Sequence, residues 1–499
     1  MKKTLRLMCL VLAALLVSVL FSACAGNEDA GSAPSAGDQG TSGGEQAGFP
    51  LEEKNWGGVT INIITHNNNT HTSYEFGTSE QGVDTVNDAF YERTALIEER
   101  YGLTTNVTRV EGLSKAAEDV ELQVVSGTDD YDLVATGVSS LVSLGMQEYL
   151  YDYYSLDNGY INLDAEYWDQ SAKEDLSIAN KLFYITGDAV VSDDSATWVM
   201  YYNKAMIEDY DLANPIELVD NNEWTIDRMY ELAREVAHKV GEGSTMSFDP
   251  EVGDVYGMVA QAYDGVSFMW GCDQAMITKD EDDLPILRID DERNINAWQK
   301  VSSIMYDEAV VGVADFHGPW NSGVYEDEGL IFTNGNALFM PGAVSTAENT
   351  LNKTEMEYGI LPMPKLDANQ EEYASSSTVY WAMMLSIPTT NVEKLDATCY
   401  LLEAMAYWGQ EICTPVYYDE ALKLKVFNDE DSERMLDLIF DNRTYDLGAV
   451  YDFAGPNAGM LQFYTSMLSN RSSDIVSNYE SKRQSFQSAI DAVISDFME

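Results

Sequence analysis

Residues 59–65 (VTINIIT) begin the part of the chain that decides the fold, because this β-branched run reads as a buried strand. A helix is predicted over 84–101, where apolar residues recur on one face and Gly102 suits the position that ends a helix. The chain then continues with a strand over 103–110, a helix over 113–125 and a strand over 131–136. This β-α-β-α-β order implies an α/β protein with a parallel sheet and right-handed crossovers.

The loops that follow the first and third predicted strands indicate where a ligand would bind. In open α/β sheets, ligands lie outside the carboxyl ends of the strands. Asn67 and Asn68 follow the first strand, and residues 136–139 (TGVS) follow the third. Side-chain amides both donate and accept hydrogen bonds, which suits hydroxyl groups. We therefore predict Asn67 and Asn68 as ligand-binding residues.

Seven short motifs follow one another along the chain in a fixed order. They are RYGL (100–103), GTDDYDLV (127–134), KLFYI (181–185), WVMYYNK (198–204), EWT (223–225), GNALFM (335–340) and YGILPMP (358–364). Together they resemble the extracellular solute-binding proteins of bacterial ABC importers, in the large family that mostly carries sugars and oligosaccharides. The resemblance spans nearly all of 55–499. It departs from the family pattern at 186–195 (TGDAVVSDDS), which is longer than the usual link.

The resemblance implies a two-lobed periplasmic-binding-protein fold of type II, with three interlobe crossings. We place the crossings near 188–196, 374–381 and 417–422. Lobe one would then comprise 51–190 plus 380–418, and lobe two 195–375 plus 422–499. A closing helix is predicted after the start signal at 472–474 (SSD).

Five further residues are candidates for ligand contact. Trp270 stands where the family presents an aromatic side chain from its second lobe. Trp381 and Asp188 lie beside predicted crossings, and Trp320 lies in a turn-rich loop. Met340 begins the segment 340–343 (MPGA), which follows a strand end and matches a family loop that borders the cleft. Aromatic faces stack on the apolar side of a sugar ring, whereas carboxylates and amides bind its hydroxyls.

The first 50 residues predict export and lipid attachment. Residues 1–23 combine a basic start with an apolar run over 7–20, which is typical of a signal peptide. FSAC at 21–24 resembles the lipobox of bacterial lipoproteins, in which Cys24 would carry the lipid, palmitate included. Residues 24–50 then form a flexible Gly/Ser-rich tether. We expect anchoring on the outer face of a cell membrane, as on a Gram-positive cell surface rather than in a periplasm. An uncleaved signal anchor and a plain secreted protein are the alternatives.

Composition narrows the possible partners. With 84 acidic and 28 basic residues the formal charge is −56, which repels phosphate backbones and excludes nucleic-acid binding. We expect no metal and no cofactor, since no motif with metal-ligand spacing occurs. Cys272, Cys399 and Cys413 are interpreted as buried free thiols, although a Cys399–Cys413 disulfide stays open.

The expected function is binding without catalysis. A monomer would clasp a small solute, most readily a saccharide, and deliver it to ABC permease subunits in the membrane. One alternative is a lipid-anchored glycosidase, which needs two carboxylates at a fixed separation. Another is the same fold with a peptide, an amino acid or a polyamine as its cargo.

Overall fold

The computed structural model describes residues 48–67, 74–77, 81–241, 243–423, 429–455 and 459–498. The predicted signal peptide, Cys24 and Asn68 lie outside these ranges. The chain divides into two units, Met1–Pro50 and Leu51–Glu499, and every contact described below lies within the second unit. No helix in the described ranges is both long and apolar enough to cross a membrane.

The first sheet has four strands in the order β12-β3-β1-β2. Its strands are β1 (Val59–His66), β2 (Leu103–Val110), β3 (Leu133–Gly137) and β12 (Met383–Ser386). β1 pairs in parallel with both β2 and β3, whereas β12 runs antiparallel to β3. The predicted three-stranded parallel core is therefore confirmed, and a strand from much later in the chain extends it.

The second sheet has five strands in the order β10-β4-β9-β5-β8. Its strands are β4 (Trp198–Asn203), β5 (Tyr256–Ala260), β8 (Val311–Val313), β9 (Ala337–Ala343) and β10 (Tyr358–Leu361). β5 pairs in parallel with β8 and β9, and β4 runs antiparallel to β9. Since Trp198 is paired with Ala343, the start of β4 lies at the edge where β5, β8 and β9 end.

Helices pack around both sheets. Around the first sheet lie α2 (Thr85–Tyr101), α3 (Lys115–Ser126), α4 (Val138–Met146), α5 (Gln170–Leu176) and α14 (Leu395–Trp408). Around the second lie α9 (Ile226–Val236), α10 (Asp264–Gly271), α11 (Glu292–Met305), α12 (Val324–Thr333), α13 (Val344–Asn349), α15 (Glu430–Asp441) and α17 (Leu461–Ser469). The predicted end of α2 is confirmed, because Gly102 has a φ of 62° and its amide donates to Glu98.

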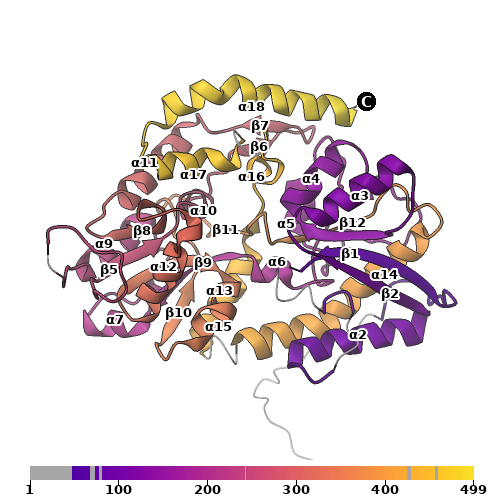
Figure 1. Cartoon of the computed structure of the whole chain (residues 1–499), viewed down its shortest axis with the longest axis horizontal. Coiled ribbons are helices and arrows are strands. Elements are labelled where there is room, and N and C mark those ends of the chain that lie inside the picture. The colour runs from indigo at the N-terminus through magenta and orange to yellow at the C-terminus, as the bar shows by residue number, and fades with distance from the viewer. Residues whose placement is uncertain are drawn as a thin grey trace, which may run out of the picture. The chain divides into compact units, whose positions relative to one another are not determined.

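Short segments from three regions of the chain join the two sheets (Figure 1). They are α6 (Ser192–Ser195), β11 (Ser375–Ser376) and β13 (Arg443–Thr444). β11 pairs in parallel with β13, and Thr197 bridges Ser377. Two of these segments, α6 and β11, lie at the crossings predicted near 188–196 and 374–381. The third predicted crossing falls in the π-helical segment Val416–Lys423. The return of the chain to this junction at β13 was not predicted.

The C-terminal helix α18 (Ile475–Met498) confirms the predicted closing helix. Its buried residues are those that the helical spacing selects: Ile475, Tyr479, Phe486, Ile490, Val493 and Phe497. Phe497 packs edge-on against Phe183, with ring centroids 5.2 Å apart. The helix contacts α11 beside the second sheet and α4 beside the first. Figure 1 shows α18 running along both the part built on the first sheet and the part built on the second sheet.

The three cysteines of the described residues are buried free thiols. The interpretation preferred from the sequence is therefore confirmed, and no disulfide joins Cys399 to Cys413. Burial raises the pKa of Cys399 to about 11 and that of Cys413 to about 12, so both stay protonated at neutral pH.

Candidate ligand-binding site

Aromatic rings gather where the strands of the second sheet end. Trp198 begins β4, and Tyr263 lies three residues after β5. Their ring centroids are 5.2 Å apart with the planes tilted by 56°. Tyr263 also lies 6.4 Å from Tyr380, which follows β11 at the second crossing. The rings therefore connect the end of the second sheet to a segment that leads into the first sheet.

The second crossing is fixed on the carboxyl end of β3. The amides of Val138 and Ser139, at the start of α4, donate to the carbonyls of Ala382 and Val379 at 3.2 and 3.1 Å. A Cβ at Gly137 would stand only 2.0 Å from the carbonyl oxygen of Tyr380, so the close approach requires glycine there. The carboxyl ends of β3 and β5 thus meet at Tyr380, where the rule for α/β sheets places a ligand.

Trp381 is the predicted ligand residue that lies on this segment, directly after Tyr380. Its side chain is 41% exposed, and it is the only tryptophan among the exposed large apolar side chains of the described residues. Its amide donates to Thr378 and its two neighbours are held by the contacts above, so the backbone at this position is firmly placed. An open indole face on a fixed segment between two sheets suits stacking against a flat ring.

Hydrogen-bonding groups line the same edge of the second sheet. The Asp264 carboxylate accepts hydrogen bonds from the Trp198 indole N–H at 2.8 Å and from the Gln261 amide at 2.7 Å. The Asp315 carboxylate accepts from the Ala262 amide at 2.7 Å and from the Tyr325 hydroxyl at 3.1 Å. Carboxylates were expected at a sugar site, but the sequence did not select these two out of 84 acidic residues.

Residues after the first strand are held by the first sheet. The Asn67 side-chain amide donates to the Glu111 carboxylate at 2.6 Å. His66 is fully buried, with its Nδ1 2.9 Å from the Thr136 hydroxyl, and burial lowers its pKa to about 4. His66 is therefore neutral at physiological pH. No contact among the described residues joins Asn67 to the aromatic rings.

Trp270 lies deeper in the structure than Trp381. It is 4% exposed, and its indole N–H donates to the Asp446 carboxylate at 3.0 Å. Its ring is 6.1 Å from that of Tyr263. It borders a cavity of about 240 Å³ whose other walls include Asp175 on α5 and Lys279. Trp270 thus adjoins the aromatic rings but has little free face.

Two other candidates occupy less open positions. Met340 is 3% exposed inside β9, opposite Tyr201 on β4. Trp320 begins a short 3-10 turn, Trp320–Ser322, and its side chain lies outside the described part of the structure. Neither position is joined to the aromatic rings by a described contact.

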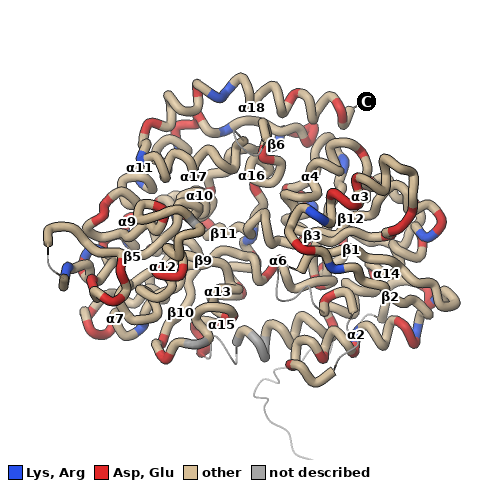
Figure 2. Tube along the Cα trace, viewed as in Figure 1, with Lys and Arg blue, Asp and Glu red and all other residues tan. Residues whose placement is uncertain are grey.

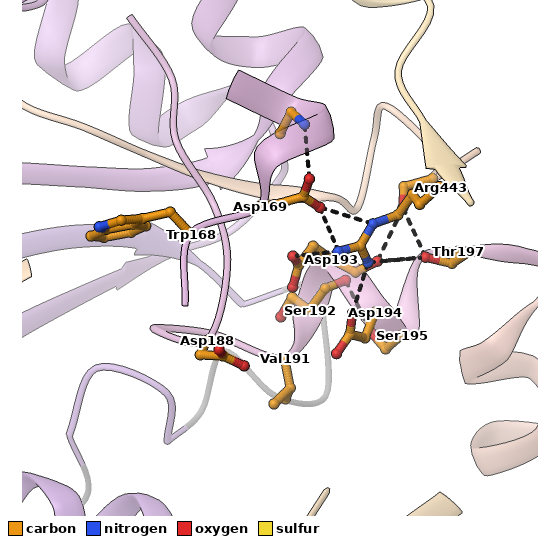
Figure 3. Close-up of polar contacts among 12 residues, drawn as sticks. Trp168, Asp169, Asp188, Val191, Ser192, Asp193, Asp194, Ser195, Thr197 and Arg443 are labelled. Atoms are coloured by element: carbon orange, nitrogen blue, oxygen red, sulfur yellow. Dashed lines mark hydrogen bonds and ion pairs between the residues drawn. The ribbon is translucent and has the colours of Figure 1, made fainter. Parts of the chain in front are cut away.

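Asp188 lies near a cluster of buried charges at the junction of the crossings (Figure 3). The Arg443 guanidinium bonds Asp169 at 2.5 Å, Asp194 at 2.7 Å and Asp193 at 3.3 Å. The side chains of Arg443, Asp169 and Asp193 are 9%, 7% and 2% exposed. These ion pairs join Asp193 and Asp194 on α6 to Arg443 on β13, and Arg443 to Asp169, which caps α5. We name this group the junction cluster.

The Asp188 carboxylate accepts a hydrogen bond from the Thr414 hydroxyl at 2.6 Å, and burial raises its pKa to about 7. The unfolded chain releases that proton near pH 4, so between about pH 4 and 7 the folded state holds the extra proton. The contribution of Asp188 to stability then falls as the pH rises through this window, by up to about 1.4 kcal/mol per pH unit. Asp188→Asn should remove this slope, which makes the variant more stable than wild type at pH 8 but not at pH 4. Urea unfolding at both pH values measures it.

The exposed Asp282, changed to asparagine, is the control for the loss of one charge. An equal difference between wild type and Asp188→Asn at the two pH values would contradict the assignment of the proton to Asp188.

No known protein-family profile matches the chain, and no curated protein matches it. Solved structures are similar over most of its length. UspC from Mycobacterium tuberculosis has a TM-score of 0.56 at 13% identity, covering 87% of this chain and 100% of its own. A sugar transporter from Rhizobium etli in an open conformation has a TM-score of 0.55 at 13% identity, covering 88% and 98%. The ABC substrate-binding protein Lmo0181 from Listeria monocytogenes, in complex with cycloalternan, has a TM-score of 0.53 at 12% identity, covering 88% and 98%.

These likenesses define the class of fold. The chain has the two-lobed α/β fold of type II periplasmic binding proteins, which the resemblance in the sequence predicted. Two of these neighbours are described as a sugar transporter and as an ABC substrate-binding protein.

Proposed function

We propose that this protein is the lipid-anchored substrate-binding component of an ABC importer. It would capture a sugar or an oligosaccharide between its two lobes, outside the cell membrane, and deliver it unchanged to a permease. Cys24 would carry the lipid, and residues 24–50 would hold the folded part away from the bilayer. The lobe boundaries predicted from the sequence, with crossings near 188–196, 374–381 and 417–422, belong to this proposal.

The observation that supports the proposal most strongly is the position of Trp381. Its side chain is 41% exposed, and it follows Tyr380, the residue at which the second crossing contacts Tyr263 after β5 and Gly137 at the end of β3. A ligand stacked there touches a segment common to both lobes. Contact with both lobes stabilises the closed form by the ligand's differential affinity for it.

Trp381→Ala should weaken saccharide binding by roughly 10–30-fold. Stacking that removes about 60–80 Å² of apolar surface contributes about 1.5–2 kcal/mol, which corresponds to that factor. Because the side chain is already 41% exposed, the midpoint of thermal unfolding should hardly change. Calorimetric titration with a saccharide panel, after a thermal-shift screen has found a binder, measures both.

Tyr210→Ala is the matched control, since Tyr210 is an aromatic side chain of similar exposure, 38%, next to α7 (Lys204–Asp209). Equal affinities of wild type and Trp381→Ala for every saccharide that binds would remove Trp381 from the site.

The alternative of a glycosidase predicts turnover. Its two carboxylates would have to flank the bond that is cleaved. Asp264 and Asp315 both lie at the same edge of the second sheet, and each accepts hydrogen bonds from two neighbouring groups. Sustained release of product from labelled oligosaccharides would overturn the proposal in favour of an enzyme.

A further inference from the structure

Three carboxylates from different elements meet at the edge of the second sheet. Asp264 begins α10, Asp315 follows β8, and Glu328 lies in the middle of α12. Asp264 and Glu328 are 1% and 2% exposed, whereas Asp315 is half-buried. Asp315 is tied to α12 through the Tyr325 hydroxyl and to the residues just after β5 through the Ala262 amide, and Asp264 is tied to the neighbouring Gln261 amide. We name these three residues the acidic face.

The acidic face contains no counterion of its own. Within the described ranges, no Lys, Arg or His side chain forms an ion pair or hydrogen bond with any of the three carboxylates, whose partners are neutral donors. The junction cluster shows the contrast, because there the chain supplies Arg443 to its buried aspartates. Buried carboxylates without a cation are costly unless a proton or a ligand neutralises them.

One of the two Glu328 carboxylate oxygens has no hydrogen-bond partner among the described residues. This oxygen, Oε2, is buried. Burial, with repulsion from Asp264, raises the pKa of Glu328 well above its usual range. Burial likewise raises the pKa of Asp264 to about 7. A buried acceptor without a partner is costly, so a donor that the described residues do not provide would stabilise it.

The aromatic rings beside the acidic face suit the same donor. The Trp198 indole is hydrogen-bonded to Asp264, and the Tyr263 ring packs against it. Aromatic faces attract ammonium groups as well as stacking on sugar rings. The large excess of acidic residues is spread over the whole unit, with Lys and Arg scattered among them (Figure 2), and this raises the local concentration of cations around the protein.

We propose that the acidic face binds a protonated amine of the ligand. This inference rests on the proposed function and narrows it: the transported solute would be a saccharide that carries a free amino group. The ammonium donates hydrogen bonds to Glu328 and Asp315, while the rings near Tyr263 and Trp381 contact the sugar.

The test is a calorimetric titration of the full-length chain with saccharides that differ only in their amine. The pairs are glucosamine with glucose, and the chitosan trisaccharide with its N-acetylated form; spermidine is a third probe. The proteins are wild type, Glu328→Gln, Asp264→Asn and, as a matched control, Glu326→Gln. Glu326 is an exposed carboxylate on the same helix, two residues from Glu328. Thermal unfolding checks that each variant folds, and Asp264→Asn serves if Glu328→Gln does not fold.

In wild type and Glu326→Gln, the amine form should bind about 10–100-fold more tightly than its neutral partner, as expected of a charge-assisted hydrogen bond. In Glu328→Gln that advantage should fall below about tenfold, with little change in the affinity of neutral saccharides.

Neutral partners that bind as tightly as the amines, or an advantage that survives both variants, would overturn the inference and leave the saccharide function standing. Binding of spermidine with no saccharide would support the acidic face as an amine site and overturn the saccharide function. Failure of every amine to bind at millimolar concentration would overturn the inference.

Discussion

Arg443→Met should lower the free energy of unfolding by about 3–5 kcal/mol, among the largest effects of a single substitution in this protein. Arg443 is the cation of the junction cluster, and its removal leaves Asp169, Asp193 and Asp194 without their counterion. It also removes a hydrogen bond to the Thr197 hydroxyl. Because these groups come from both sides of the junction, the loss should appear in the cooperative unfolding of the whole unit, followed in urea at neutral pH.

Arg434→Met is the control, since Arg434 pairs with Asp220 and Asp431 on the surface, where its side chain is 49% exposed. Such a pair contributes about 0–1 kcal/mol. Burial raises the pKa values of Asp193 and Asp194, and Arg443 lowers them, so they rise further without it. The loss of unfolding free energy in Arg443→Met should therefore become smaller as the pH falls, because the carboxylates then take up protons. A loss no larger than that of Arg434→Met would contradict this account of the junction.

Trp270→Ala should cost about 3–5 kcal/mol of stability, as expected for a large buried side chain. The substitution creates a cavity beside one that already holds about 240 Å³. It also removes the indole N–H that donates to the buried Asp446 carboxylate. Asp446 keeps hydrogen bonds from the amides of Met276 and Gly448, so its charge remains partly compensated.

Trp270→Phe separates packing from hydrogen bonding and from ligand contact. It keeps a ring in place, so it should recover most of the stability while losing the bond to Asp446. If Trp270 acts only in packing, Trp270→Phe should bind saccharides as wild type does. A Trp270→Ala variant of unchanged stability and lost affinity would contradict the packing role and restore Trp270 as the stacking residue.

Much of the fold could be predicted because its signals are local. The spacing of apolar residues predicted both the helix α18 and the residues on its buried face. Gly102 predicted the end of α2. The β-α-β-α-β run predicted the parallel pairing of β1, β2 and β3. The junction could not be predicted in the same way, because Arg443 meets aspartates some 250 residues earlier in the chain.

The site was less accessible from sequence for the same reason. Trp381 was selected because it lies beside a crossing, and the structure places it there. The buried indole of Trp270 is hydrogen-bonded to Asp446, which is 176 residues away. The acidic face draws on α10, α12 and the end of β8, and among 84 carboxylates no spacing distinguishes Asp264, Asp315 and Glu328. Side chains gathered by tertiary contacts leave no local pattern.

The distance between the lobes, with and without solute, tests the central claim most directly. Spin labels at Leu122 on α3 and Val240 near β5 would report it, because both side chains are exposed, at 66% and 61%. The account predicts that a saccharide found to bind shortens this distance. The Trp381→Ala variant should need a higher saccharide concentration to reach the same shortening. A saccharide that binds tightly while the distance stays fixed would contradict closure of two lobes around the solute.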